Sequence, residues 1–341
     1  MTVPDTSEQA ELRSAIRGLL GRELDPDSPP AWTAPAWTTP AWTTRWKRMA
    51  GELGLTGLGV PESQGGAGAG LAEIAVAVEE TGRVLAPVPY LSTALAGYVL
   101  GRAGLCGDIL PGIADGSLRA AFVFSWPLTV SGDRVRGVAH HVLDGAVADL
   151  FIVACGNSLW VVRAADARVT RVDTLDQTRS QAVVEFGSAV AVPVPGVAAA
   201  LAEDLFRVLL AVESAGAAAH CLDVTVAYLK ARKQFGRELG TFQALRHRCA
   251  DLAVEVTAAA ATAQAAVAGA ADPRVLGPLA KKYCADVFWR VAAEMIQLHG
   301  GIGFTWEHQA HRYLKRAKTT QLVLGSPAEL RRLVAERASL L

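Results

Sequence analysis

The spacing of apolar residues changes twice along this chain, and the change limits the folds that it can adopt. The apolar side chains recur at helical spacing at both ends of the chain, for example over Val254–Ala271. Leu118–Pro195 instead carries short β-branched and aromatic runs separated by Gly, Asp and Asn. The sequence therefore predicts an α+β fold: an N-terminal helical domain over 1–117, a middle β-domain of six or seven strands over 118–196, and a C-terminal helical bundle over 197–341.

Local signals predict several individual helices. Thr6–Glu23 is amphipathic, and Leu71–Val84 follows a glycine-rich loop. Ser326-Pro327-Ala328-Glu329 combines a capping box with proline at the first helical position, which indicates that a helix begins there.

A proline- and tryptophan-rich insert over 25–46 interrupts the N-terminal helices. Its AWTxP unit repeats every five residues and carries Trp32, Trp37, Trp42 and Trp46. Proline at that frequency is incompatible with a helix interior, so we predict an extended segment. The tryptophans either pack on this subunit or a neighbouring one, or form a partner-binding arm. The cost of exposing indole rings favours packing.

The stretch Val226–Gln243 has the character of an anion site. A helix ends in the basic pair Arg232-Lys233, glycines turn the chain, and a second helix follows with Thr241 at the expected N-cap and Gln243 in its first turn. A guanidinium, backbone N–H groups and a helix N-terminus suit a phosphate or pyrophosphate. A helix-turn-helix with a solvated basic corner is the alternative.

These residues and a second motif are similar to those of the flavin-dependent acyl-CoA dehydrogenase family. Tyr228, Arg232, Gln234-Phe235-Gly236, Phe242-Gln243 and Ala250-Asp251 resemble its YxxxRxQFG…FQ…AD signature, and Gln297–Phe304 resembles its Q-x-x-GG-x-G-F turn. The resemblance covers nearly the whole chain. It implies the same α–β–α architecture, with a four-helix bundle at the C-terminus.

The family's catalytic base is missing from both positions where the resemblance would place it. Most members carry a Glu before the Gly-Thr near the C-terminus, and Leu324 stands there in this chain. Other members carry the base at the start of the long helix that leads into the YxxxRxQFG stretch, and the matching residue is Phe206. Neither side chain can accept a proton. Glu213, two helical turns beyond Phe206, is a candidate for a displaced base, but ~10 Å of axial travel favours a buried or interface carboxylate.

The β-domain departs from the family in the same way. Its flavin-facing TExxxGSD motif is shortened to Phe122–Pro127, and its W-x-T element is replaced by Val138–His141, without tryptophan or threonine. The pair His140-His141 has no third ligand spaced near it, so we predict no metal site.

The retained and lost motifs divide along the two sides of the family's shared flavin site, which is bound across a dimer interface. By resemblance, the groups that reach a neighbour's FAD are retained: Arg232, Gln234, Phe235, Gln243, Gln297, Gly300 and Gly301. The groups that hold the ring and the base are lost. This pattern resembles the non-catalytic subunit of the α2β2 acyl-CoA dehydrogenases that actinobacteria use on steroid side chains.

The resemblance implies partners and substrates as well as a cofactor. We expect FAD, a homologous catalytic subunit, a bulky and steroid-derived acyl-CoA, and electron-transfer flavoprotein acting on the complex, with Asp204 and Arg207 as candidate substrate-binding residues. Two alternatives stay open. One is a self-sufficient enzyme with a non-standard base such as Glu213 or Asp204, and the other is a flavin-free scaffold subunit.

Composition excludes several other classes of protein. The chain has 341 residues, with 33 basic and 33 acidic side chains, so its balanced charge does not favour nucleic acid or an anionic membrane. The five cysteines lack zinc or disulfide spacing. The apolar windows are short or interrupted by charge, and the first residues carry no signal-peptide core, so we expect a cytoplasmic protein without a membrane span.

Overall fold

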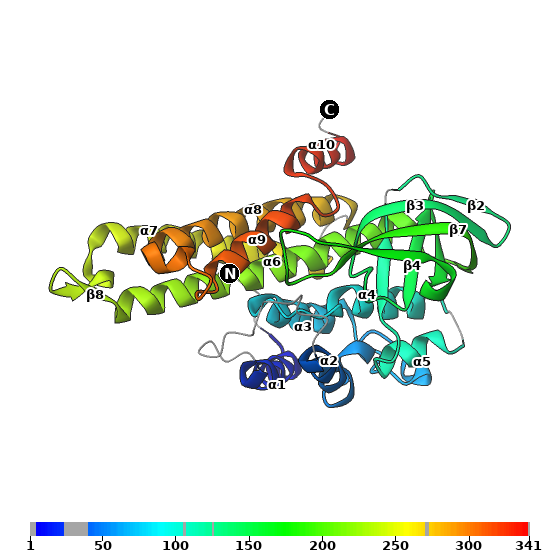
Figure 1. Cartoon of the computed structure of the whole chain (residues 1–341), viewed down its shortest axis with the longest axis horizontal. Coiled ribbons are helices and arrows are strands. Elements are labelled where there is room, and N and C mark those ends of the chain that lie inside the picture. The colour runs from blue at the N-terminus through cyan, green and yellow to red at the C-terminus, as the bar shows by residue number, and fades with distance from the viewer. Residues whose placement is uncertain (1–4, 24–39, 105–106, 125, 270–272, 340–341) are drawn as a thin grey trace. The chain divides into compact units, whose positions relative to one another are not determined.

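The structure is a computed structural model of the chain and describes residues 5–23, 40–104, 107–124, 126–269 and 273–339 (Figure 1). The described residues follow the predicted order of helices, sheet and helices, so the predicted fold class is confirmed. They cluster into two compact units. The first comprises segments 1–30, 78–86 and 207–341, and the second comprises 31–77 and 87–206. The two predicted boundaries between the three domains remain predictions.

The second unit is built around one mixed sheet. The seven strands that the structure describes there lie within the segment predicted to be β, and they run as follows: β1 (Ala120–Val123), β2 (Thr129–Ser131), β3 (Arg134–Leu143), β4 (Leu150–Cys155), β5 (Ser158–Arg163), β6 (Arg168–Val172) and β7 (Gln181–Val194). Their order is β1-β4-β5-β7-β3-β2, with β6 also paired to β7, and β1 and β4 are parallel (Figure 1). Alternating residues bury a core that includes Phe151, Val162, Val184 and Phe186.

Helices complete the second unit. They are α2 (Pro40–Gly51), the first part of α3 (Leu71–Arg83), α4 (Tyr90–Arg102), α5 (Ile109–Ala114) and the first turns of α6 (Ala199–Ala231), with 3₁₀ turns at Leu55–Gly57 and Glu62–Gln64. Nearly every residue of α4 is buried. Thr93, on this helix, accepts a hydrogen bond from the Ala120 N–H at 3.1 Å, which attaches α4 to the start of β1.

The prediction of an extended insert is wrong for its last residues. Helix α2 begins at Pro40, where the first turn of a helix tolerates proline because its missing N–H has no partner there in any case. Trp42 and Trp46 are four residues apart on α2, and both are buried. The Trp46 indole donates to the Gly116 carbonyl at 2.7 Å. These two tryptophans therefore pack within their own subunit, whereas Trp32 and Trp37 lie outside the described residues.

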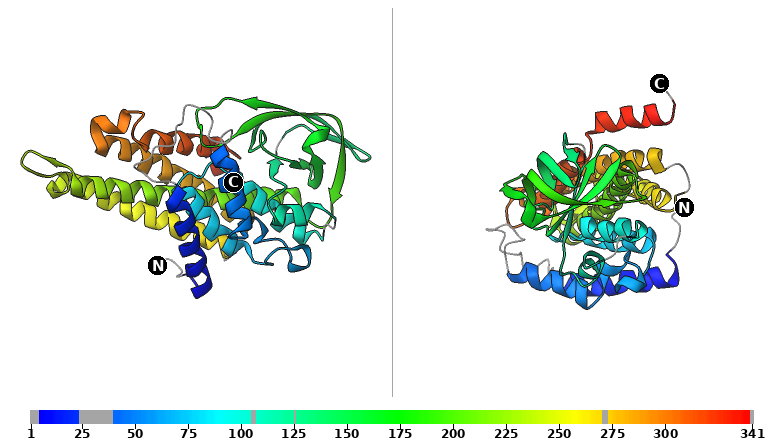
Figure 2. Two further views of the ribbon diagram at one scale, coloured as in Figure 1. Left: turned by 60° about the horizontal axis from the view of Figure 1, so that its bottom comes forward. Right: turned by 90° about the vertical axis from the view of Figure 1, so that its right-hand side faces the viewer.

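The first unit is helical. It contains α1 (Ser7–Glu23), the end of α3, most of α6, α7 (Gln243–Val267), α8 (Pro273–His299), α9 (Ala310–Leu322) and α10 (Pro327–Arg337), with the short hairpin of β8 (Lys233–Gln234) and β9 (Arg237–Glu238). The views of Figures 1 and 2 agree that α6, α7, α8 and α9 lie side by side. The predicted capping box at α10 is confirmed, since Ser326 and Glu329 cap each other's backbone N–H.

Small residues let α3 approach α6 closely. A Cβ added at Gly216 would lie 2.4 Å from the Glu79 carbonyl oxygen, so a larger side chain at Gly216 would force the two helices apart. Helix α6 is also long and apolar enough to cross a membrane by length and composition, but 78% of its most apolar window is buried. It is therefore a buried core helix, as its small residues and close packing require.

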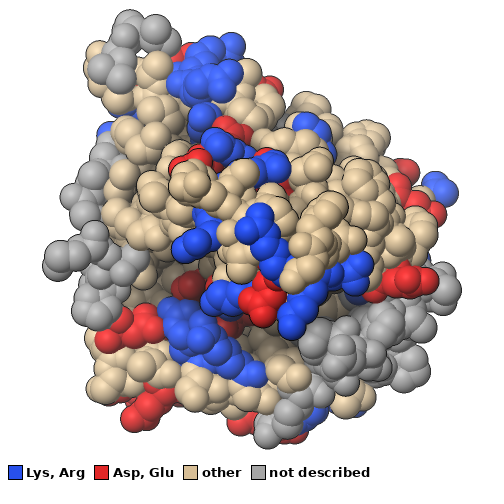
Figure 3. All heavy atoms as spheres, turned by 90° about the vertical axis from the view of Figure 1, so that its left-hand side faces the viewer, with Lys and Arg blue, Asp and Glu red and all other residues tan. Residues whose placement is uncertain are grey.

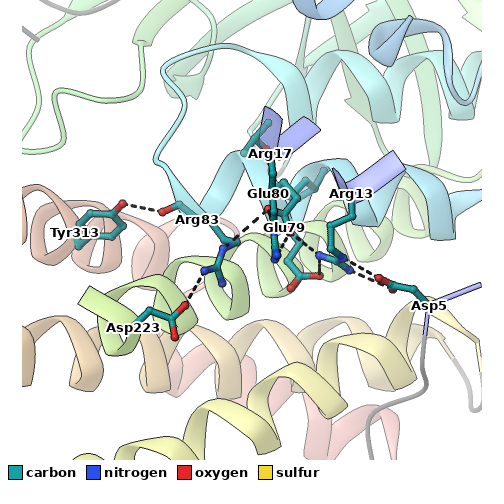
Figure 4. A network of polar contacts seen from close by, with 10 residues as sticks. Asp5, Arg13, Arg17, Glu79, Glu80, Arg83, Asp223 and Tyr313 are labelled. Carbon is teal, nitrogen blue, oxygen red and sulfur yellow. Dashed lines mark hydrogen bonds and ion pairs between the residues drawn. The ribbon is translucent and has the colours of Figure 1, made fainter. Parts of the chain in front are cut away.

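A network of charged side chains attaches α1 to the rest of the first unit (Figure 4). Glu80 is 2% exposed and accepts hydrogen bonds from Arg13 at 2.6 Å and from Arg17 at 2.7 Å. Arg83 pairs with Asp223 on α6 at 2.7 Å, as the same figure shows. Because Glu80 is buried and binds both arginines, losing its charge would remove the contact that Arg13 and Arg17 share, and Arg13 would keep its pairs with Asp5 and Glu79.

Candidate functional site

The end of α6 leads into an exposed hairpin that carries three of the predicted cofactor residues. Arg232 follows the last residue of the helix, and Gln234 ends strand β8. Phe235 and Gly236 both have positive φ, at 53° and 77°, which is the backbone of a type I′ turn. Phe235 is 86% exposed, an unusual state for an aromatic residue in a turn. The turn therefore presents this ring outward.

Helix α7 begins at Gln243, so this residue lies in the first turn as predicted, but the N-cap of the helix differs from the prediction. A 3₁₀ turn over Leu239–Thr241 shifts the cap to Phe242, whose side chain cannot accept a hydrogen bond. The Thr241 hydroxyl instead donates to the Glu238 carbonyl at 2.6 Å. The helix therefore starts without a side-chain cap, and its N-terminal N–H groups stay available to an anion.

A guanidinium group and two aromatic rings lie in contact at this hairpin. The Arg237 guanidinium lies 3.8 Å from the centroid of the Phe242 ring, and the Phe235 ring meets Phe242 edge-on at 6.1 Å. Figure 3 faces this end of the first unit and shows Lys and Arg side chains spread over it. Aromatic faces beside guanidinium groups suit a ligand that combines phosphate with a planar ring.

A second exposed segment carries the other predicted cofactor residues. Helix α8 ends at His299 and a 3₁₀ turn follows over Gly300–Phe304. Gln297, Gly300 and Gly301 are all exposed. Gly300 has φ 64°, and a Cβ added there would meet nothing within 4 Å, so its peptide faces open space. The positive φ requires glycine or a strained residue, and the open side lets a ligand approach the backbone.

Aromatic contacts join these two segments. The Tyr228 hydroxyl donates to the His299 carbonyl at 3.3 Å, and the two rings stack at 4.4 Å. The His299 ring also contacts the His308 ring, with the two ring centroids 4.4 Å apart. The structure thus brings the seven predicted cofactor residues to neighbouring exposed segments of one unit. Sequence reasoning missed His299 and His308, whose only signal was their position beside the glycines.

The first predicted base position, Phe206, is occupied by an aromatic core. Phe122 lies on β1 and Phe124 directly follows this strand, and their rings stack with centroids 5.1 Å apart. The Phe206 ring meets them edge-on, with centroid distances of 5.6 and 5.9 Å. All three rings are at most 6% exposed. A carboxylate at position 206 would be buried beside the rings of Phe122 and Phe124, where its charge is strongly disfavoured.

The second base position, Leu324, lies in a turn that is held by buried cations. Its φ is 55°, rare for leucine, and its carbonyl accepts a hydrogen bond from Arg207 at 3.2 Å. Lys281 is 1% exposed and donates to the carbonyls of Gln321 at 2.9 Å and Gly325 at 2.6 Å. Burial lowers the pKa of Lys281 to about 7, with Arg207 adding to the shift. The turn is therefore fixed through its backbone, whatever the side chain at 324.

The remaining candidates are buried. Glu213 pairs with Arg316 at 3.0 Å, and the arginine is 2% exposed. Asp204 is 0% and Arg207 is 6% exposed. An ion pair inside the first unit gives Glu213 a structural partner, and a role of Glu213 as base or of Asp204 and Arg207 in substrate binding stays a prediction.

The histidine pair in the sheet lies on an irregular part of β3. The pairing of β3 with β7 shifts its register between Ala139 and Val142, and His140 and His141 lie at this irregularity. His141 has φ 52°. Both are exposed. Within the described ranges, no group of three or more His, Cys, Asp or Glu side chains is arranged to hold a metal ion.

Comparisons with known proteins agree with this arrangement. Residues 6–117 match the family of the acyl-CoA dehydrogenase N-terminal domain, and residues 198–339 match that of the C-terminal domain. The chain therefore belongs to the acyl-CoA dehydrogenase family of oxidoreductases, whose members are generally FAD-dependent. The resemblance inferred from the two motifs is confirmed.

One curated relative and two solved structures are similar to this chain over nearly its whole length. The chain is 37% identical to acyl-CoA dehydrogenase IpdE2 of Mycolicibacterium smegmatis, over 97% of this chain and 99% of that protein. Among solved structures, it is similar to a variant of the Tcur3481–Tcur3483 steroid ACAD, with TM-score 0.88 and 30% identity over 97% and 99% of the two chains. It is also similar to the ChsE4–ChsE5 complex of Mycobacterium tuberculosis, with TM-score 0.89 and 25% identity over 99% of each chain.

Proposed function

We propose that this chain is the non-catalytic subunit of a cytoplasmic, heteromeric acyl-CoA dehydrogenase of α2β2 composition. A homologous partner supplies the base and most of the flavin site. The complex introduces an α,β double bond into a bulky acyl-CoA, and electron-transfer flavoprotein accepts the electrons. The single observation that carries the proposal is a contrast in exposure: all seven predicted cofactor residues are exposed, whereas Phe206 lies inside a ring cluster.

The exposed residues fit the phosphate-bearing part of FAD. The fork of Arg232 suits a bidentate contact to phosphate oxygens, and the uncapped start of α7 beside Gln243 adds a partial positive charge. The open backbone at Gly300 and Gly301 admits close contact by a polar group, and Gln297 supplies an amide beside it. When bound, FAD supplies the acceptor for the hydride that leaves Cβ of the thioester.

The nature of the acyl group is inferred from relatives. One similar structure is a steroid ACAD, and another is a complex of two differently named chains. A steroid-derived acyl-CoA and a heteromeric assembly are therefore the substrate class and arrangement that we propose for this chain.

Co-purification with the partner tests the proposal. The chain alone should be colourless and inactive with acyl-CoA. Co-expressed with its partner, it should form an oligomer that contains about one flavin for each pair of chains, measured from the absorbance of released flavin and the protein concentration. A yellow, active homomer with one flavin per chain would overturn the proposal, and an assembled complex without flavin would favour a scaffold subunit.

A further inference from the structure

Three aromatic rings form a continuous stack beneath the Gly300–Phe304 turn. Tyr228, His299 and His308 come from α6, α8 and the segment before α9. The first two rings lie 4.4 Å apart with an interplanar angle of 26°, and the two histidine rings lie 4.4 Å apart at 43°. Offset ring contacts at this separation are attractive beyond the area that they bury.

Hydrogen bonds show which ring nitrogen of each histidine carries the proton when the ring is neutral. His299 is 3% exposed, and its Nδ1 lies 2.7 Å from the Met295 carbonyl, so Nδ1 carries the proton and donates it. His308 accepts a hydrogen bond at Nδ1 from the Ala310 N–H at 3.2 Å, which leaves the proton of a neutral ring on Nε2. These two tautomers allow the rings to lie in contact without like charges facing each other.

The stack connects the two segments of the candidate site. Tyr228 precedes Arg232 by four residues, about one helical turn. His299 directly precedes Gly300, and its carbonyl accepts the hydrogen bond from the Tyr228 hydroxyl. A displacement of the turn would therefore break a ring contact and a hydrogen bond at the same end of α6.

We propose that Tyr228, His299 and His308 are positioning residues that hold the Gly300–Phe304 turn in register with Arg232, and that the turn loosens when His308 takes up a proton. The consequence for FAD rests on the proposed function. The positioning itself is a property of this chain alone.

The charges around His308 favour this behaviour. His299 on α8 and His311 on α9 lie near it, and a positive charge on either ring would disfavour a proton on His308. Arg312 and Lys315 add positive charge around His311. Tyr228 on α6 contacts the ring of His299, and Glu307, the exposed residue before His308, is the acidic neighbour in the chain.

Burial and these neighbours also set the titration range. Desolvation lowers the pKa of His308 to about 4, with His299 and His311 adding to the shift, and desolvation lowers the pKa of His299. An opened turn would return the pKa of His308 towards ~6.5. Lowering the pH from 7.5 to 5 should therefore favour the open turn by a factor on the order of ten.

Hydrogen exchange of the Gly300–Phe304 amides in the full chain tests the positioning without flavin or partner. His308→Ala removes the ring, so at pH 7.5 exchange corrected for intrinsic rates should rise about threefold to tenfold. His308→Phe keeps a ring that cannot take up a proton. It should protect the turn at pH 7.5 and, unlike the wild type, keep that protection at pH 5. His247→Ala, an exposed histidine on α7, is the control and should change neither value.

The outcomes separate this proposal from the proposed function. Unchanged exchange in His308→Ala, or an equal response of wild type and His308→Phe to pH, would overturn the positioning role. In the complex, His308→Ala should weaken FAD binding about threefold to tenfold, and His308→Phe should restore it at pH 7.5. If exchange responds as expected but Arg232→Ala leaves FAD affinity unchanged, the positioning role stands and the proposed cofactor contact fails.

Discussion

The exposed end of the first unit and the ring cluster of the second unit have opposite characters. At the first, Phe235 is 86% exposed, and the Arg237 guanidinium lies over the neighbouring Phe242 ring. At the second, Phe206 is 2% exposed and lies among aromatic rings. Exposed aromatic and cationic side chains are typical of a surface that binds a ligand or a partner. An apolar side chain at the position of a catalytic base cannot accept a proton. This difference supports the proposal that the chain keeps one side of a shared flavin site, while the residues at the base position of the other side belong to an apolar core.

A carboxylate at position 206 should produce the largest effect. Phe206→Glu removes a buried ring and places a charge between Phe122 and Phe124, so the free energy of unfolding should fall by about 4 kcal/mol or more. Phe206→Leu, the control, should cost only about 1–1.5 kcal/mol. Denaturant titration measures both. A stable Phe206→Glu chain that oxidises acyl-CoA on its own would contradict the comparison, because the second unit would then still hold a usable site.

Substitution of Glu213 should have the next largest effect on stability. It also tests the alternative in which the chain is a self-sufficient enzyme with Glu213 as its base. Glu213→Gln removes the charge that pairs with the buried Arg316 guanidinium and should cost about 3 kcal/mol. The control is Glu255→Gln, which breaks the exposed pair with Arg290 and should cost less than about 1 kcal/mol. Where the complex still assembles, its turnover should persist with Glu213→Gln. Loss of turnover in a stably folded, flavin-loaded complex would instead indicate that Glu213 is the base.

The sequence allowed the fold to be predicted wherever the signal was local. The change in spacing located the segment that contains the seven described strands, and Ser326 with Glu329 located the start of α10. Two local predictions failed because neighbouring residues changed the geometry. Pro40 begins helix α2, although the AWTxP repeat predicts an extended segment there. A 3₁₀ turn places the N-cap of α7 at Phe242 in place of Thr241.

Contacts between distant residues could not be predicted in the same way. The family motifs supplied the exposed cofactor residues, but nothing in the spacing of Phe122 and Phe206 indicates that their rings meet. The ring stack of Tyr228 with His299 joins residues 71 positions apart. Such pairs depend on how whole helices and strands pack, which is not encoded in any short stretch of sequence.

Acid should destabilise the first unit through its histidines. Burial lowers the pKa of His220 and of His308 to about 4, so between pH 6.5 and 4 the unfolded chain binds more protons than the folded one. Stability is therefore full above about pH 6.5 and falls as the pH drops towards 4. Each buried histidine contributes at most ~1.4 kcal/mol per pH unit. Denaturant titrations from pH 7.5 to 4.5 give the free energy of unfolding at each pH. This free energy should fall less steeply with falling pH in His220→Gln than in the wild type, and an equal fall would contradict this assignment.

The smallest effect should come from Leu324→Glu. The side chain is partly exposed, the left-handed backbone is equally unfavourable for either residue, and Lys281 and Arg207 hold the turn through its carbonyls. Stability should change by less than about 1 kcal/mol. The isolated chain should gain no acyl-CoA dehydrogenase activity, because a base without the flavin-holding elements has no acceptor beside it. Turnover by this single variant would show that the missing strand motifs were not limiting.

Flavin affinity of the Arg232→Ala complex tests the central claim most directly. If Arg232 binds a phosphate of FAD held by the partner, alanine should weaken flavin binding by ~1.5–3 kcal/mol, which is roughly tenfold to a hundredfold in Kd. Arg232→Lys should recover only part, because an ammonium cannot form a bidentate fork. Lys233→Ala, which removes the neighbouring exposed cation, should have a smaller effect. Alternatively, Arg232 stabilises only the end of α6, worth about 0.3–1 kcal/mol. In that case Arg232→Ala would lower the melting temperature slightly and leave the Kd for flavin unchanged, and that result would contradict the account.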